Sequence, residues 1–390
     1  MPTTPLRNAV YRAALPFLAP SPRGQMTHAF SGERLVRMAE YERLLCRHHV
    51  LGASLMLSDG GQTRIVYTST RRPAHVAAPD TMFRVASITK MATAMVALML
   101  CDEGLFTLDS PVAPLLPVHA DALPGVTVRH LLCHLSGLRD TPAVDAALRA
   151  GQSLADVLAA PGVIAGRPGE RFAYCNLGFG LLGCLFEQAT GQPLEAVFRS
   201  HLFAPLGMRA TLDGSTLAEQ PVMPISRVLP YRPDQDVTVP TLGRRPLSAA
   251  DPARRFGHTA GALYTDAPSL SRLLTLIASG GVWEGKRLVS EGAIREMTTQ
   301  QSFSGPADRP ERSYGLGLVI LRRPDLSDGR ILGHQGFAYG CVDGAFYEES
   351  TGRQVIFLCG GASEARQGRL GLCNRDLLRW ALKEEIPSWT

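Results

Sequence analysis

Ser87 and Lys90 are the residues whose types and spacing most directly suggest covalent chemistry in this chain. They lie three positions apart in VASITKMATAMVALM, residues 85–99, and positions i and i+3 of a helix share one face. Their neighbours are apolar, and dehydration favours the neutral form of an amine. A neutral lysine can take the proton of the serine hydroxyl, which turns that hydroxyl into a nucleophile.

The rarity of lysine supports this hypothesis. Only three of the forty basic residues are lysine, namely Lys90, Lys286 and Lys383, and the others are arginine. Arginine cannot lose its proton in a protein, so a lysine is needed where a cation has to become neutral. An S-x-x-K pattern alone is common by chance, and an N-cap serine followed by a solvated lysine is the simpler alternative. The pattern therefore needs partner residues.

Two further motifs supply candidate partners. RFAYCNLGFG contains Tyr174, Cys175 and Asn176, and RILGHQGFAYG places His334-Gln335-Gly336 at the end of an expected strand. The order S-x-x-K, Y-x-N, [K/H]-x-G resembles the serine β-lactamase and penicillin-binding-protein superfamily. The chain looks most similar to the class C-like branch, which holds D-alanyl-D-alanine carboxypeptidases, D-aminopeptidases and β-lactamase-like carboxylesterases. The resemblance covers roughly residues 33–385.

The resemblance implies a role for each matching residue. Ser87 is expected to be acylated by the substrate and Lys90 to activate it. Tyr174 is expected to share the proton and pass it to the leaving group. Asn176 is expected to hold Lys90 and the oxygen of the acyl group. Cys175, between the tyrosine and the asparagine, is interpreted as a packing residue and not as a second nucleophile.

The third motif implies the rest of the site. The backbone N–H groups of Ser87 and Phe337, the residue after Gly336, are expected to form an oxyanion hole, whose donors are each worth about 10²–10³ in rate. His334 is expected to stand beside Tyr174 and help set its proton. Many lactam-processing members have lysine and threonine where this chain has His334 and Gln335, and those residues bind the carboxylate of the antibiotic.

The replacement of lysine and threonine by His334 and Gln335 bears on the choice between an esterase or amidase and a β-lactamase. A histidine is mostly neutral near pH 7, so binding of a carboxylate-bearing lactam is expected to be weak. The sequence thus predicts a serine hydrolase that cleaves small carboxylic esters or amides through an acyl-enzyme, with esters favoured. The alternatives within enzymes are a D-aminopeptidase, a DD-carboxypeptidase or a weak class C-like β-lactamase. The alternative outside enzymes is a non-catalytic binding or assembly member of the superfamily.

Other patterns are weaker. GFGLLG, residues 178–183, matches a dinucleotide motif, but no Val/Ile-rich strand precedes it, so close helix packing is the better interpretation. HLLCH offers His130, Cys133 and His134 on one helical face as metal ligands, without a further ligand at a usual spacing. No metal and no cofactor is therefore expected. His258 either lines the substrate pocket or caps a turn, and both readings stay open.

Composition limits partners and compartment. The formal net charge is +5, but the arginines are scattered, which argues against nucleic-acid binding. The eight cysteines form no CxxC pair and lie among apolar residues, as free thiols in a reducing compartment would. The N-terminus is a poor secretion signal, and no apolar run approaches the ~20 residues of a membrane helix. A soluble, cytoplasmic protein is expected, with a peripheral role of its first 25 residues and its oligomeric state left open.

Strand-like segments lie near both ends of the chain and helical segments fill the middle. GASLMLSD and TRIVYTST flank a Gly-Gly turn and predict a hairpin, and helices are expected at residues 33–48 and 369–385. The fold class is α/β (α+β): a β-lactamase-like antiparallel sheet flanked by helices, with an inserted all-helical domain. The expected parts are an N-terminal extension (1–29), an α/β domain from both chain ends (30–115 and 255–390) and the helical insert (116–254).

Overall fold

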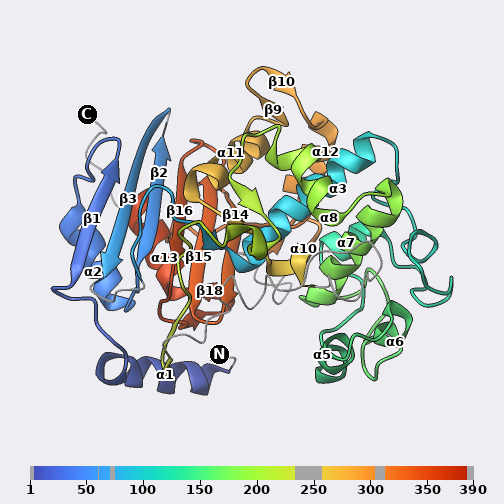
Figure 1. Ribbon diagram of the computed structural model, residues 1–390, viewed down its shortest axis with the longest axis horizontal. Coiled ribbons are helices and arrows are strands. Elements are labelled where there is room, and N and C mark those ends of the chain that lie inside the picture. Colours follow the sequence, from blue (N-terminus) through green and yellow to red (C-terminus); the bar gives the residue numbers. More distant parts are fainter. Residues whose placement is uncertain (1–3, 60, 71–74, 233–256, 304–311, 384–390) are drawn as a thin grey trace.

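The computed structural model describes residues 4–59, 61–70, 75–232, 257–303 and 312–383. A nine-stranded sheet, in which neighbouring strands are antiparallel, extends from one edge of the molecule to its middle, on the left in Figure 1. The predicted antiparallel sheet with flanking helices is confirmed, and the two ends of the chain meet where β2 pairs with β16. In spatial order the strands are β1 (Met26–Ser31), β3 (Gln62–Thr70), β2 (Ala53–Asp59), β16 (Gln354–Cys359), β15 (Cys341–Glu348), β14 (Ile331–Ala338), β13 (Val319–Leu321), β12 (Arg312–Tyr314) and β11 (Ser302–Phe303).

The central strands are buried on both faces. In β16, Val355 and Phe357 point into one hydrophobic cluster, whereas Ile356 and Leu358 point into another. Successive side chains of a strand face opposite sides of the sheet, so an uninterrupted apolar run suits a strand that is covered twice. This explains why the C-terminal strands read as continuous apolar runs.

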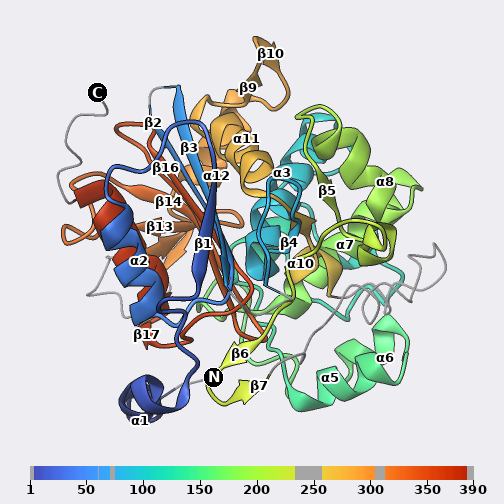
Figure 2. The ribbon, with the colours of Figure 1, turned by 60° about the vertical axis from the view of Figure 1, so that its left-hand side comes forward.

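Helices cover both faces of the sheet (Figure 2). On one face pack α2 (Met38–Arg47) and α13 (Leu372–Leu378), and on the other α3 (Thr89–Asp102) and α11 (Ala267–Ala278). The two helices expected at residues 33–48 and 369–385 thus form, but they begin at Met38 and Leu372. The segment just before α13 pairs instead as a short hairpin of β17 (Arg366–Gln367) and β18 (Leu370–Gly371).

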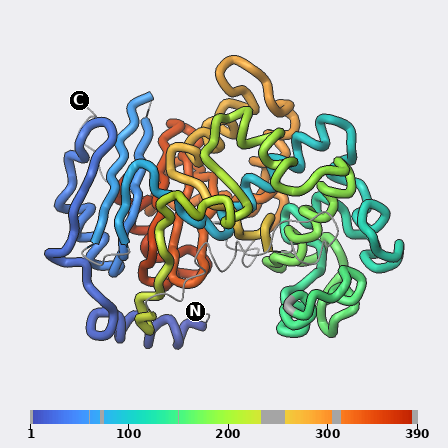
Figure 3. The backbone as a smooth tube through the Cα atoms, in the orientation of Figure 1, coloured from blue at the N-terminus to red at the C-terminus, as the bar shows by residue number. Residues whose placement is uncertain are grey.

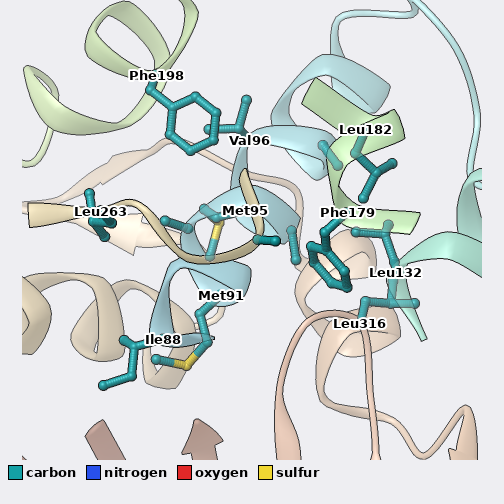
Figure 4. Close-up of a cluster of buried hydrophobic side chains, with 14 of the residues drawn as sticks. Ile88, Met91, Met95, Val96, Leu132, Phe179, Leu182, Phe198, Leu263 and Leu316 are labelled. Atoms are coloured by element: carbon teal, nitrogen blue, oxygen red, sulfur yellow. The ribbon is translucent and has the colours of Figure 1, made fainter. Parts of the chain in front are cut away.

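Helix α3 is almost completely buried in the hydrophobic core. All residues from Thr89 to Leu100 are buried, so this helix has no polar face. Its side chains pack against other helices and loops, as in the cluster of Figure 4, where Met91 and Met95 lie near Phe179. A helix that is apolar on all sides is a core helix. Lys90, in its first turn, is therefore placed in a dry environment by the helix itself.

The middle of the chain is helical, as expected. Between α3 and α11 lie α4 (Val128–Leu132), α5 (Pro142–Arg149), α6 (Leu154–Leu158), α7 (Asn176–Thr190), α8 (Leu194–Phe198) and α10 (His258–Gly261). Short strands accompany them: β4 (Phe83–Arg84) pairs with β8 (Tyr264–Thr265), which pairs with β5 (Ala210–Thr211), and β6 (Arg227–Val228) pairs with β7 (Tyr231–Arg232). The last helix before β11 is α12 (Glu291–Thr298), preceded by the hairpin of β9 (Val282–Trp283) and β10 (Lys286–Arg287).

The first residues form more structure than an extension. Helix α1 (Pro5–Leu18) runs along the lower edge of the molecule beside the segment around β6 and β7 (Figure 3). Strand β1 begins at Met26 and joins the sheet, so the boundary expected at residue 29 falls inside a strand. Among the residues that the structure describes, no helix is long and apolar enough to cross a membrane. The part of the predicted insert from 233 to 254 lies outside the described residues.

Candidate active site

Ser87 lies in η1 (Ala86–Ile88), a 3₁₀ turn between β4 and α3. Ala86 has a left-handed φ of 45°, a conformation that costs a non-glycine residue about 1–2 kcal/mol. Strand β14 packs against this turn so closely that a Cβ on Gly336 would lie 2.4 Å from the carbonyl oxygen of Val85. The glycine of the third motif is therefore required for this close approach between strand and turn.

Lys90 is fully buried and lies one turn beyond the serine. Its Nζ is 3.1 Å from the Oγ of Ser87, 2.9 Å from the Oδ1 of Asn176 and 2.7 Å from the carbonyl oxygen of Ala260 in α10. The predicted proximity of serine and lysine is thus observed. It arises from a 3₁₀ turn followed by the first turn of α3, not from one continuous helix.

These three contacts suit an amine that changes its protonation state. An ammonium can donate one hydrogen bond to each of the three oxygens. A neutral amine keeps two hydrogens, which match the oxygens of Asn176 and Ala260, and its lone pair then faces the hydroxyl of Ser87. The arrangement can therefore hold Lys90 in place both before and after it accepts the serine proton.

Asn176 is oriented by a residue that the sequence motifs did not single out. Its Nδ2 donates to the Oδ2 of Asp140 at 2.8 Å, so its Oδ1 is the atom that faces Lys90. The same carboxylate accepts the backbone N–H groups of Asn176 and Leu177 at 2.9–3.0 Å. Asp140 thus caps the N-terminus of α7, where unpaired N–H groups favour an anion, and fixes the amide of Asn176.

Tyr174 faces an open cavity of about 480 Å³ with Ser87 and Asn176. The Nζ of Lys90 lies 4.9 Å from the centroid of the tyrosine ring. The tyrosine hydroxyl forms no hydrogen bond with the part of the chain that the structure describes. Catalytic hydrogen bonds are often completed only when substrate binds, so the hydroxyl is placed to meet a ligand in the cavity.

Behind Tyr174 lies a buried chain of three hydrogen-bonded rings. The backbone N–H of Cys175 donates to the Nδ1 of His134, so the proton of His134 is on Nε2, 3.2 Å from the hydroxyl of Tyr314. That hydroxyl is 3.0 Å from the Nε2 of His334, whose Nδ1 must donate to the carbonyl oxygen of Gln335. The backbone donor to Nδ1 makes His134 neutral, and bonds that run in one direction along the chain fit a neutral His334 as well, with tautomers inferred from this network.

His134 is the member of this chain nearest to Tyr174. Its ring centroid lies 4.3 Å from that of Tyr174, against 6.4 Å for His334. Burial, followed by the positive charge of Lys90, lowers the pKa of His134 well below its usual value. His334 also lines the cavity with Tyr174, and its Nε2 is hydrogen-bonded to Tyr314. That it helps to set the proton of Tyr174 stays a prediction.

Gln335 has a structural part in the cavity wall. Its Nε2 donates to the carbonyl oxygen of Arg369, and its Oε1 accepts the N–H of Gly371 at 3.0 Å. Both ends of the amide are thereby occupied in holding the β17–β18 hairpin against β14. Phe337 also lines the cavity, and its ring carries the guanidinium of Arg366 at 4.1 Å.

The cavity is basic. Four arginines line it and, among its lining residues in the described ranges, none is acidic; they are Arg84, Arg227, Arg366 and Arg369. Arg227 has a partner in Glu364, at 3.9 Å. Burial, which disfavours the charged form, lowers the pKa of Arg366 and of Arg369. The third motif carries no cation, but the hairpin behind it does.

The Beta-lactamase family model matches residues 32–366, which is most of the chain. The chain belongs to the Beta-lactamase family. The predicted resemblance is thereby confirmed. The matched range contains all the residues of the three motifs and the additional residues Asp140, His134 and Tyr314.

Family members with different names are similar to this chain. Esterase EstB of Burkholderia gladioli is 26% identical over 373 residues, which is 87% of this chain and 93% of that protein. Penicillin-binding protein 4 of Amycolatopsis lactamdurans is 31% identical over 188 residues, so the match spans 46% of this chain and only about half, 48%, of that relative. The solved D-amino acid amidase of Ochrobactrum anthropi SV3 shares the fold, with a TM-score of 0.65 at 24% identity over 87% of this chain and 95% of the amidase.

The weaker sequence patterns have structural explanations in this Beta-lactamase family member. His130 and His134 of HLLCH bond to different partners, because His130 accepts from the backbone N–H of Thr127 in a helix cap. In GFGLLG, a Cβ on Gly183 would lie 2.9 Å from Thr259 of α10, so close helix packing explains that glycine. Cys175 is a buried free thiol whose pKa is raised by burial, which agrees with a packing role. His258 begins α10, next to Gly257, a cavity residue.

Proposed function

We propose that this protein is a serine hydrolase that cleaves small carboxylic esters through an acyl-enzyme on Ser87. The observation that carries the proposal is the position of the Lys90 Nζ, fully buried and 3.1 Å from the serine Oγ at the edge of the cavity. A structural lysine needs no such partner, whereas a general base does.

The proposed reaction has two halves. Lys90 takes the proton of Ser87, whose oxygen attacks the ester carbonyl, and the N–H groups of Ser87 and Phe337 stabilise the resulting oxyanion. Tyr174 gives its proton to the leaving alcohol and regains one from Lys90. Water then attacks the acyl-enzyme, with the same groups acting in reverse, and releases the acid and the free serine.

Two observations favour esters over β-lactams. His334 is bonded at both ring nitrogens, to the hydroxyl of Tyr314 and the carbonyl oxygen of Gln335, an arrangement that fits a neutral ring with no charge for the carboxylate of a lactam. The amide of Gln335 is occupied by the hairpin at both ends and is not available to a ligand without breaking those bonds. Similarity to an esterase over 87% of this chain supports the same choice.

A second candidate function rests on the basic cavity. Arg366 and Arg369 could hold the free carboxylate of a peptide, as a DD-carboxypeptidase would require, because guanidinium groups bind carboxylates bidentately. A D-aminopeptidase or amidase is the variant of this candidate without a free carboxylate. A non-catalytic binding role remains the alternative from a different class, and it gives no reason for a buried lysine against Ser87.

The test compares substrates and one serine variant. Turnover of p-nitrophenyl acetate and butyrate is measured beside nitrocefin, D-alanyl-D-alanine and a D-amino acid amide, with Ser200→Ala as an exposed-serine control. We expect the esters to be turned over fastest, Ser87→Ala to lose this activity, and a fluorophosphonate to add its mass at Ser87 alone. Turnover of only the dipeptide would favour the carboxypeptidase, and no labelling of Ser87 would refute the acyl-enzyme.

A further inference from the structure

Helix α1 has one face bound to the rest of the protein. Leu15 is buried in a small cluster with Leu51 and Val228, and Tyr11 packs beside them. This contact explains one side of the helix. The other apolar residues of α1 lie outside it.

Polar contacts strengthen the bound face. Asn8 forms two hydrogen bonds with the backbone of Arg366. The Nδ2 of Asn8 donates to the carbonyl oxygen of Arg366 at 2.7 Å, and the backbone N–H of Arg366 donates to the Oδ1 of Asn8 at 3.0 Å. The backbone N–H of Glu364 donates to the hydroxyl of Tyr11 at 3.0 Å. Since Arg366 lines the cavity, α1 is bonded directly to the segment that forms part of the cavity wall.

The opposite face of α1 exposes large apolar side chains. Leu6, Val10 and Phe17 are spaced by four and seven residues, which places them on one side of a helix, and they are 75%, 61% and 86% exposed. Leu18, beside them, is 66% exposed. Scattered single apolar residues on a surface are ordinary, but a continuous stripe on one helix marks an interaction site.

Charge identifies the kind of partner. Arg7 and Arg12 are exposed and, at 100° per residue, lie about 80° and about 140° from the middle of the stripe. They border the wider exposed face of α1, which the stripe forms together with small or apolar residues at positions 9, 13 and 16. The chain has no acidic residue before Glu33, so nothing acidic on α1 offsets these arginines. An apolar stripe with arginines on both sides is the pattern of a helix that lies in the interface of an anionic bilayer, where the arginine side chains reach the headgroups.

We propose that α1 docks this protein onto an anionic lipid surface, with Leu6, Val10 and Phe17 inserted among the lipids. A second copy of the chain fits the stripe less well, because a symmetric contact between two such helices brings the same arginines toward each other. In this orientation α1 lies between the bilayer and the segment of Arg366, which Asn8 and Tyr11 bind on the opposite face of the helix, so one wall of the cavity is one helix away from the lipid.

The experiment is co-sedimentation of the full chain with vesicles of phosphatidylcholine alone and of an equal mixture with phosphatidylglycerol. We expect binding to the mixed vesicles and little to phosphatidylcholine alone. Phe17→Glu should lower the partition coefficient at least about tenfold, because burying one phenylalanine is worth that much or more. Val36→Glu, at a site 70% exposed outside α1, is the matched control and should leave binding unchanged.

A second pair of variants tests the charge. Arg7→Gln with Arg12→Gln should reduce binding to the mixed vesicles and make it less sensitive to salt, whereas Arg295→Gln with Arg379→Gln, at exposed sites elsewhere, should not. Thermal melting checks that each variant is folded. The proposal is overturned if the parent chain stays in the supernatant with mixed vesicles, or if Phe17→Glu binds as the parent does. A concentration-dependent dimer that Phe17→Glu abolishes would assign the stripe to self-association instead.

Discussion

Asp140→Asn tests whether the orientation of the Asn176 amide matters for the chemistry of Lys90. In the parent, the carboxylate of Asp140 accepts the Nδ2 of Asn176 and two backbone N–H groups. An asparagine keeps one acceptor oxygen and turns an NH2 group toward these donors. Nothing then fixes the Asn176 amide with its Oδ1 toward Lys90. If the amide rotates by about 180°, its NH2 group faces the Nζ of Lys90 and the acceptor for the lysine is lost.

The magnitude follows from the bonds that are lost. Hydrogen bonds to charged groups contribute about 1.5–3 kcal/mol each, so losing one or two of those of Asp140 should destabilise the fold by about 2–4 kcal/mol. For catalysis, a Lys90 held with one fewer acceptor should lower kcat about 10- to 100-fold, within the range of general acid–base effects. KM is measured as well, because Asn176 lines the cavity and a flipped amide exchanges the donor and the acceptor that it offers to a substrate.

The assay measures kcat and KM for p-nitrophenyl butyrate and, separately, unfolding in urea. Asp145→Asn is the matched control, since Asp145 is an exposed carboxylate in the first turn of α5, close in sequence to Asp140. A variant that is destabilised but keeps the parent kcat would refute the reasoning. It would show that Asp140 is only a helix cap and that the amide orientation is not limiting.

Three further outcomes are expected. Lys90→Arg should nearly abolish ester turnover although it preserves charge, because a guanidinium stays protonated; most of the parent kcat remaining would contradict the general-base role. Tyr174→Phe should lower kcat about 10²-fold or more, yet less than Ser87→Ala, and burst kinetics would show whether acylation is the slowed step. Burial raises the pKa of Asp343 to about 8, so the folded state keeps a proton that the unfolded state loses near pH 4, and the free energy of unfolding should fall as pH rises between these values. Asp343→Asn should flatten that slope in thermal melts from pH 4 to 8, and parallel profiles for variant and parent would contradict the raised pKa.

The pattern of apolar residues predicted those helices and strands in which buried side chains recur regularly or form an uninterrupted run. The hairpin around the Gly-Gly turn appears as β2 and β3, and the long apolar run after Ser87 is α3. Strand β1 was not predicted. MTHAFS alternates between half-buried and exposed residues at the edge of the sheet, so its sequence carries little apolar signal. Its pairing with β3 depends on tertiary contacts that the segment itself does not encode.

Some residues of the site could likewise be predicted from the sequence, whereas others could not. The motifs predicted that Ser87, Lys90 and Asn176 come together, since fixed spacing and a known order identify such residues. Asp140 and Tyr314 were missed because each acts across the fold, 36 residues from Asn176 and 20 residues from His334. Both are single polar residues in loops or strand ends, without a repeated spacing. His134 was noticed only as a possible metal ligand, because a buried histidine looks the same in sequence whatever it bonds.

The amide of Asn176 explains how a buried lysine beside a carboxylate can still act as a base. The Nζ of Lys90 lies 2.9 Å from the Oδ1 of Asn176, and the Nδ2 of Asn176 lies 2.8 Å from the Oδ2 of Asp140. The amide therefore connects the lysine to the carboxylate by two hydrogen bonds, without direct contact between the two charged groups. A carboxylate placed directly on Lys90 would favour the ammonium and prevent it from taking the proton of Ser87. The chain thus surrounds Lys90 with dipoles, whose oxygens on Asn176 and Ala260 can accept a hydrogen bond from the amine and from the ammonium alike.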